Sequence, residues 1–272
     1  MKRFLNILLL LSLTILLTVP VSAASYKVVK SYSYLPASER TVNGAVIVWN
    51  NSVSGTSLYA TKSGKTYTLT SSPASGEVLS NGSVSYYFEK GNSKIIFYKT
   101  NLSSGKRTKI VSFKTSFPSV TNLILVGKNL YFTHGEVEGD FARINLSTKK
   151  YKKIKGNVTY FTKHGQYFLL TDGTGAGYSY LGSYNTKSGK YKKIISKPIR
   201  WFEKNNKVYI VVTKSGNSYS GNPYTIKIVR YNLKTGKSKT LVNSLTLTRI
   251  LDLTNTHIRY INSSGAEKTK KF

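Results

Sequence analysis

The chain has 272 residues, of which 41 are Lys or Arg and 10 are Asp or Glu, and it contains no cysteine. Stabilisation by disulfides is therefore excluded, so the fold depends on a hydrophobic core, which a chain of this length can form. The net charge of +31 is larger than solubility requires, and it favours contact with a polyanion.

Residues 1–23 have the layout of a secretory signal peptide. Lys2 and Arg3 precede an apolar run, and the small-residue sequence Val21-Ser22-Ala23 follows it. The alternative is a membrane anchor, but the apolar run is shorter than the about 20 residues that a span needs. We expect cleavage after Ala23 and secretion of residues 24–272 as one domain. Exported chains without disulfides are typical of Gram-positive bacteria, which is the source we expect.

The segments after the leader predict β-strands. Short runs of β-branched and aromatic residues are bounded by Gly, Asn and Ser, and no run keeps the i, i+3, i+4, i+7 apolar spacing of a helix. In chain order, the clearest predicted strands span 44–49, 83–88, 94–99, 129–133, 167–171 and 207–213. The sequence therefore predicts an all-β protein.

A turn phrase recurs along the chain. The five copies are YATKSGKTYTL from Tyr59, TNLSSGKRTKI from Thr100, INLSTKKYKKI from Ile144, YNTKSGKYKKI from Tyr184 and YNLKTGKSKTL from Tyr231. The lysines that close the turns are separated by 41, 44, 40 and 47 residues. A period of about 40–45 residues that contains several short strands is typical of propeller blades.

Each phrase is interpreted as a hairpin between two antiparallel strands. Glycine provides the positive φ of a tight turn, and Asn and Thr bond to nearby backbone groups. In the third copy Lys149 replaces the glycine. We therefore expect that turn to be strained or one residue longer.

The phrase N-L-x-T-G-K, as in Asn232 to Lys237, resembles the outer hairpin of secreted and periplasmic bacterial β-propellers. These include the TolB-like group and related propeller families of unknown function, in which the turn joins the third and fourth strands of a blade. The resemblance covers most of the chain after the leader. It implies a β-propeller fold, but no particular ligand.

Five complete outer hairpins and a C-terminal remainder predict six blades. The last blade lacks its outer strand, and the N-terminal segment 25–33, SYKVVKSYS, is similar to the fourth-strand phrase KYKKIIS at 190–196. We expect this N-terminal strand to complete the last blade and so to close the ring. The alternative is five blades plus a cap.

The five turns are expected on one face of a propeller, because each joins the third and fourth strands of its blade. Lysines in and beside these turns would make that face basic. The predicted anion-binding residues are Lys65, Lys106, Lys150, Lys190, Lys237, Lys152, Lys153, Lys192 and Lys193. Lysine also protects exposed strand edges, but balancing Glu would protect them equally well.

The expected partner of this face is an anionic wall polymer such as teichoic acid, or the phosphates of a membrane surface. Lysine suits a diffuse row of phosphates better than bidentate base recognition, and no helix-turn-helix, zinc-finger or RNP motif is present. Sequence-specific nucleic-acid binding is not expected. We expect a secreted monomer that its charge retains at the cell wall.

The opposite face is expected to carry the long loops and most of the acids. Four acids, Glu136, Glu138, Asp140 and Asp172, with His134 beside the first three, are candidate ligands for Ca²⁺. The alternative is a solvated loop, and no other cofactor is expected. Tyrosines in or beside these loops could contact a ligand instead of packing between blades; they are Tyr178, Tyr180, Tyr219 and Tyr224.

Catalytic constellations are not found. The chain has no G-x-S-x-G elbow, and 10 acids over the whole chain leave few for carboxylate-based hydrolysis. We expect a non-catalytic protein that binds anionic envelope polymers through its lysine-rich face and a protein or glycan partner through the opposite loops. The alternative is a carbohydrate-binding or carbohydrate-processing protein with its site on the loop face.

Overall fold

The structure is a computed structural model, and it describes residues 26–30, 46–50, 57–136, 138–174, 177–218 and 220–272. This part of the chain forms 23 strands and no helix, so the prediction of an all-β protein is confirmed. All six of the clearest predicted strands are present. No helix in the described ranges is long and apolar enough to cross a membrane.

The strands form six antiparallel sheets, numbered here in chain order. Sheet 1 consists of β2 (Val46–Asn50), β3 (Leu58–Lys62) and β4 (Lys65–Thr70). Sheet 2 consists of β5 (Glu77–Ser80), β6 (Val84–Gly91), β7 (Lys94–Asn101) and β8 (Arg107–Lys114), with β1 (Lys27–Lys30) added beside β5. Sheet 3 consists of β9 (Val120–Val126), β10 (Asn129–His134), β11 (Gly139–Asn145) and β12 (Lys150–Val158).

The C-terminal half repeats the same four-strand meander. Sheet 4 consists of β13 (Tyr160–His164), β14 (Tyr167–Thr174), β15 (Gly177–Asn185) and β16 (Lys190–Ser196). Sheet 5 consists of β17 (Pro198–Lys204), β18 (Lys207–Ser215), β19 (Tyr224–Asn232) and β20 (Ser238–Leu247). Sheet 6 consists of β21 (Arg249–Leu253), β22 (His257–Ile261) and β23 (Glu267–Lys271).

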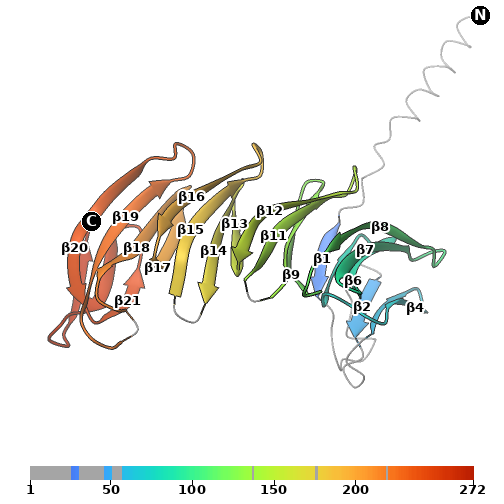
Figure 1. The fold of residues 1–272 in the computed structure, drawn as a ribbon, viewed down its shortest axis with the longest axis horizontal. Coiled ribbons are helices and arrows are strands. Elements are labelled where there is room, and N and C mark those ends of the chain that lie inside the picture. Colours follow the sequence, from blue (N-terminus) through green and yellow to red (C-terminus); the bar gives the residue numbers. More distant parts are fainter. Residues whose placement is uncertain (1–25, 31–45, 51–56, 137, 175–176, 219) are drawn as a thin grey trace, which may run out of the picture.

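The sheets follow one another along the long axis of the molecule, with sheet 1 near one end and sheet 6 at the other (Figure 1). The expectation that the N-terminal strand completes the last blade is wrong, because β1 pairs with β5 in sheet 2. In that register Val28 and Val29 lie opposite Leu79 and Val78. Pairing with β23, whose sequence is EKTKK, would instead place the lysines of two strands side by side, which is unfavourable.

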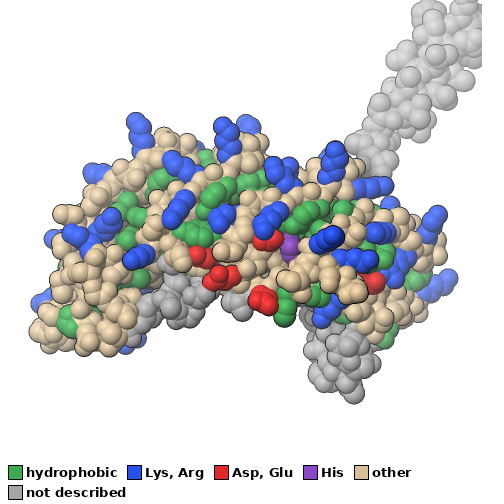
Figure 2. Space-filling model, in the orientation of Figure 1, with side chains coloured by type: hydrophobic (Ala, Val, Ile, Leu, Met, Phe, Trp, Pro, Cys, Tyr) green, Lys and Arg blue, Asp and Glu red, His purple; other side chains and the backbone are tan. Residues whose placement is uncertain are grey.

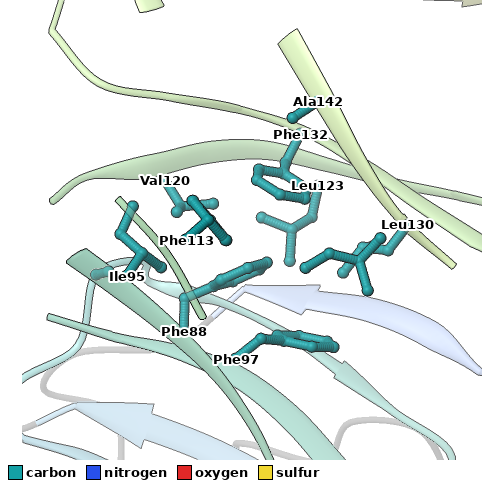
Figure 3. Packing of buried hydrophobic residues seen from close by; sticks show 11 residues of the cluster. Phe88, Ile95, Phe97, Phe113, Val120, Leu123, Leu130, Phe132 and Ala142 are labelled. Atoms are coloured by element: carbon teal, nitrogen blue, oxygen red, sulfur yellow. The ribbon is translucent and has the colours of Figure 1, made fainter. Parts of the chain in front are cut away.

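Neighbouring sheets pack face to face through apolar side chains. Between sheets 2 and 3, Phe88 and Phe97 of sheet 2 meet Leu130 and Phe132 of sheet 3 in one buried cluster (Figure 3). The rings of Phe88 and Phe132 have centroids 4.9 Å apart. Aromatic pairs at this separation stabilise a core beyond the area that they bury.

Sheet 6 is polar on the side that has no neighbouring sheet in the described ranges. Ile258 packs inward, and the register puts Arg259 and Glu267, which form an ion pair, on the outer side. A polar outer face is what a terminal repeat of an open array requires. In sheet 1, Leu58 and Ala60 pack inward, while Tyr59 and Thr61 lie on the other side, and the register pairs Tyr59 with Trp49.

The five predicted outer hairpins are all present, as β3–β4, β7–β8, β11–β12, β15–β16 and β19–β20. In the last four, an Asn side-chain oxygen accepts hydrogen bonds at 2.8–3.1 Å from the backbone N–H groups two and three residues later. The same Asn accepts a bond through its carbonyl from the residue four positions later, at 2.8 Å. These residues are Asn101, Asn145, Asn185 and Asn232. The asparagine thus closes each turn.

The third hairpin has the length of its neighbours, and Lys149 occupies the position of the turn glycine. Its φ is 57°, compared with 69° for Gly189 and Gly236. A side chain with a Cβ is strained in this left-handed region. Of the two alternatives for this turn, strain is therefore correct.

We predict that Lys149→Gly raises the free energy of unfolding by about 1 kcal/mol, because it removes left-handed strain. The reciprocal control Gly189→Lys should lower it by a similar amount, since the nearest atom to an added Cβ is 3.8 Å away and only the backbone is disfavoured. Urea unfolding measures both. If the free energy of unfolding changed in the same direction in both variants, the interpretation of strain at Lys149 would be contradicted.

We also predict that small-angle scattering gives a radius of gyration clearly above the about 18 Å expected for a compact domain of this length. The reason is the open row of sheets. A value close to that of a compact domain would indicate that the row closes into a ring in solution.

Candidate functional site

All nine predicted anion-binding lysines are exposed. Three of them, Lys65, Lys150 and Lys190, begin the outer strands β4, β12 and β16, while Lys106 and Lys237 directly precede β8 and β20. In Figure 2, lysines and arginines project along the upper edge of the row of sheets and are scattered over the visible face, while several acids lie at the lower, hollowed edge. We call the nine residues the lysine surface. Each of the nine lies in or beside an outer hairpin.

In two outer strands, β12 and β16, a tyrosine that fixes the strand against its sheet lies between lysines. In β16, the half-buried Tyr191 lies between the exposed Lys190 and Lys192. Its hydroxyl lies over Gly182 so closely that a Cβ at that glycine would be 2.6 Å from it. Any larger residue at position 182 would push Tyr191, and with it the lysines of β16, away from the sheet.

The positive charge of this surface is almost uncompensated. Within the described ranges, Lys153 is the one member of the nine with an ion pair, at 2.8 Å from Asp140. Lys192 instead reaches the next sheet, where its ammonium donates to the Gly236 carbonyl at 3.3 Å and lies 5.6 Å from the Tyr231 ring. Lys192 thus connects the lysines of sheet 4 to the outer hairpin of sheet 5.

The four candidate calcium ligands do not converge. Asp140 is paired with Lys153, and one Asp172 oxygen accepts the backbone N–H groups of Ser179 and Tyr180 at 2.9 and 3.0 Å. Glu136 and Glu138 are exposed. Among the described residues, no group of three or more His, Asp or Glu side chains could hold a metal ion.

Three of the four candidate tyrosines, Tyr178, Tyr180 and Tyr224, are in strands, which corrects the expectation that they lie in or beside loops. Tyr180 belongs to β15 and Tyr224 to β19, and both are buried. The Tyr180 hydroxyl donates to the Asn157 carbonyl at 2.7 Å, and Tyr224 joins the core between sheets 5 and 6. Tyr219 and the side chain of Tyr178 lie outside the described residues.

His134 ends β10 on the side opposite the lysine turns and is 5% exposed. Its Nε2 lies 2.9 Å from the Tyr151 hydroxyl, and its ring packs against Phe113 with centroids 4.8 Å apart. Burial lowers the pKa of His134 to about 4, although the nearby Asp140 carboxylate acts in the opposite direction. The imidazole is therefore neutral at neutral pH.

An exposed apolar side chain lies on the side that carries His134, and it was not predicted from the sequence. Phe117, in the link from β8 to β9, is 48% exposed. The only available signal was an apolar residue inside the polar sequence TSFPS at 115–119. Such a residue is as often buried as exposed, so position in the fold was needed to recognise it.

No protein-family model matches the chain, and no curated protein matches it either. Solved structures with some similarity include TolB from Acinetobacter baumannii, with 18% identity, a TM-score of 0.36, and coverage of 84% of this chain and 63% of TolB. An oligogalacturonate lyase in complex with manganese gives 10% identity, a TM-score of 0.45, and coverage of 90% and 78%.

The N-terminal domain of Nup159 gives 8% identity and a TM-score of 0.38, and covers 64% of this chain. The chain spans 49% of the length of that domain. TolB represents the group that the turn phrase resembles, but similarity at this level assigns neither a family nor a function.

We predict that acidification from pH 6.5 to about 4 destabilises the protein through His134. The unfolded chain binds a proton at the ordinary pKa of 6.5, and the folded chain does so only near 4. Stability is therefore lost as the pH falls through this window, by up to about 3 kcal/mol. Urea unfolding across the window should show a shallower pH dependence for His134→Gln than for the wild type. Equal slopes would contradict the prediction.

Proposed function

We propose that this protein is exported and that it binds an anionic polymer of the cell envelope through the lysine surface, without catalysing a reaction on it. The polymer is a phosphate-rich wall polymer such as teichoic acid; membrane phosphates are the second source of the same chemistry. The observation that carries the proposal is that nine exposed lysines lie in or beside the five outer hairpins, with one ion pair among them in the described ranges.

The spacing of the lysines supports a polymer in preference to a small anion. Each of the five outer hairpins contributes its own lysines, and packed sheets stand about 10 Å apart. An extended chain of phosphates could therefore contact several sheets at once and release counterions at each of them. A single phosphate would contact only one hairpin.

Lysine composition also supports diffuse binding. An ammonium group is a compact charge on a flexible stem, so it can follow phosphates in many conformations of a polymer. Lys192 donates a hydrogen bond to a backbone carbonyl of the next hairpin. This bond leaves the positive charge of the surface unneutralised. Retention at the wall would then depend on ionic strength.

We further infer that the six sheets correspond to propeller blades. Sheets 2 to 5 contain the complete four-strand meander, and sheets 1 and 6 contain three strands in the described ranges. This interpretation rests on the meander and on the repeated outer hairpin. Export rests on residues 1–23, which lie outside the described residues.

We predict that replacing Lys106, Lys150, Lys190 and Lys237 by Gln weakens binding to teichoic-acid-containing walls. The slope of log affinity against log salt concentration should fall by about 3, because each lysine contributes about 0.7–0.9. Co-sedimentation across a salt series measures the slope. Walls stripped of teichoic acid and vesicles of phosphatidylglycerol distinguish the two sources of phosphate.

The matched control replaces four exposed lysines on the opposite side, at the ends of strands or in the links, by Gln. These are Lys94, Lys114, Lys197 and Lys214. The change in net charge is identical, so this variant should keep most of the wild-type slope. An equal loss in both variants would show that net charge alone drives binding, and the lysine surface would not be a site.

A further inference from the structure

A hollow opens on the side of the molecule opposite the outer hairpins. Its volume is about 560 Å³, within the usual range for pockets that hold small ligands. The wall comes from the link β8–β9, from β9 and β10, from the following loop and from the link β12–β13. The lining residues are Phe117, Ser119, Thr121, Thr133, His134, Gly135, Glu136, Val158 and Thr159.

The loops around the hollow are held in place by the backbone. The Gly135 N–H donates to the Ser119 carbonyl at 3.0 Å, which joins the two loops, and the Ser119 N–H donates to the Phe117 carbonyl at 2.9 Å. At Gly139 a Cβ would lie 2.4 Å from the His134 carbonyl oxygen. Glycine is thus required for the loop to fold back this tightly, and Phe117 projects from an ordered link.

The chemistry of the wall is apolar, hydroxylic and acidic. Phe117 is 48% exposed, and the hydroxyls of Thr121 and Thr133 lie 2.8 Å apart. Glu136 provides one exposed carboxylate. No lysine or arginine is among the lining residues in the described ranges, so nothing here attracts the phosphates that suit the lysine surface.

His134 provides an independent indication of a ligand. It is 5% exposed and so 95% buried, and it forms part of the wall of the hollow. Its Nε2 is bonded to Tyr151, while its Nδ1 is buried and has no hydrogen-bond partner among the described residues. A buried polar atom without a partner is costly, so its presence in a residue of this wall calls for an explanation.

We propose that this hollow binds a neutral sugar unit. The apolar face of a pyranose ring would pack on Phe117, and its hydroxyl groups would donate to the Glu136 carboxylate and exchange hydrogen bonds with the threonine hydroxyls. A purely apolar ligand would leave the carboxylate and hydroxyls unsatisfied. An anionic ligand would be repelled by Glu136, and Lys114, which lines the adjoining hollow with Glu136, is not among the lining residues of this one. The site is separate from the lysine surface and does not depend on it.

The test is titration of the purified protein with chitotetraose, cellotetraose, maltotetraose and mannotetraose, followed by calorimetry and saturation-transfer NMR. The titrations are carried out at high salt, which weakens electrostatic binding to the lysine surface. We expect at least one tetrasaccharide to bind. Phe117→Ala and Glu136→Gln should each weaken its binding about tenfold, which corresponds to about 1.4 kcal/mol. Both side chains are exposed, so the thermal midpoint of unfolding should not change and folding does not confound the result.

Two matched controls are available. Tyr160 is 49% exposed, like Phe117, but it is not among the lining residues, and Glu138 lines only an adjoining hollow of about 280 Å³. Tyr160→Ala and Glu138→Gln should bind within twofold of the wild type. The proposal is overturned if no tetrasaccharide binds the wild type. It is also overturned if Phe117→Ala or Glu136→Gln keeps wild-type affinity, or if either control loses as much as its counterpart.

Discussion

Face-to-face packing of successive sheets is the constraint on which the rest of this structure depends. Each inner sheet has a neighbour on both sides, so its central strands must be apolar on both faces. In β10 and β18, five successive residues are buried, in contrast to the alternation of a strand with one face in water. Sheet 6 is released from this requirement on the side without a neighbour in the described ranges, and there the sequence becomes polar, as at Arg259 and Glu267.

In the outer hairpins, the residues that the turns require for folding differ from the lysines that we propose bind a partner. Each turn after the first needs an asparagine to accept the backbone N–H groups and a residue that tolerates a positive φ. The lysines beside these positions satisfy no such requirement. Their excess is therefore independent of the fold, which is why we ascribe it to a partner.

Local features of the fold, such as the hairpin turns, could be predicted from the sequence, but the pairing of strands that are distant in the chain could not. The period and the turn residues suffice for the hairpins, because the turn chemistry of Asn185 or Gly189 acts within a few residues. The strain at Lys149 follows from the same local rule. The partner of the N-terminal strand was predicted wrongly because the sequence KVVK resembles that of an outer strand. Its partner depends on how well it pairs with β5 compared with β23, and the sequence of the strand alone does not contain this comparison.

The same limit applies to the candidate site. Exposure of the lysines follows from their position in a turn, so their placement was predictable. Tyr180 and Tyr224 were placed in loops because glycine-rich sequence lies nearby, whereas the strands extend far enough to bury them. The hollow is assembled from links of different sheets, which no single stretch of sequence contains.

Strand β12 joins the two surfaces of the molecule. Its exposed lysines belong to the lysine surface, and Lys153 is paired with Asp140 at the start of β11. Between them Tyr151 turns inward, stacks on Phe113 with ring centroids 4.3 Å apart and bonds to His134 in the wall of the hollow. Alternation along a strand sends neighbouring side chains to opposite faces. In the segment Lys150 to Lys152, the two lysines therefore belong to the lysine surface, while Tyr151 between them points to the opposite face and supports the wall of the hollow.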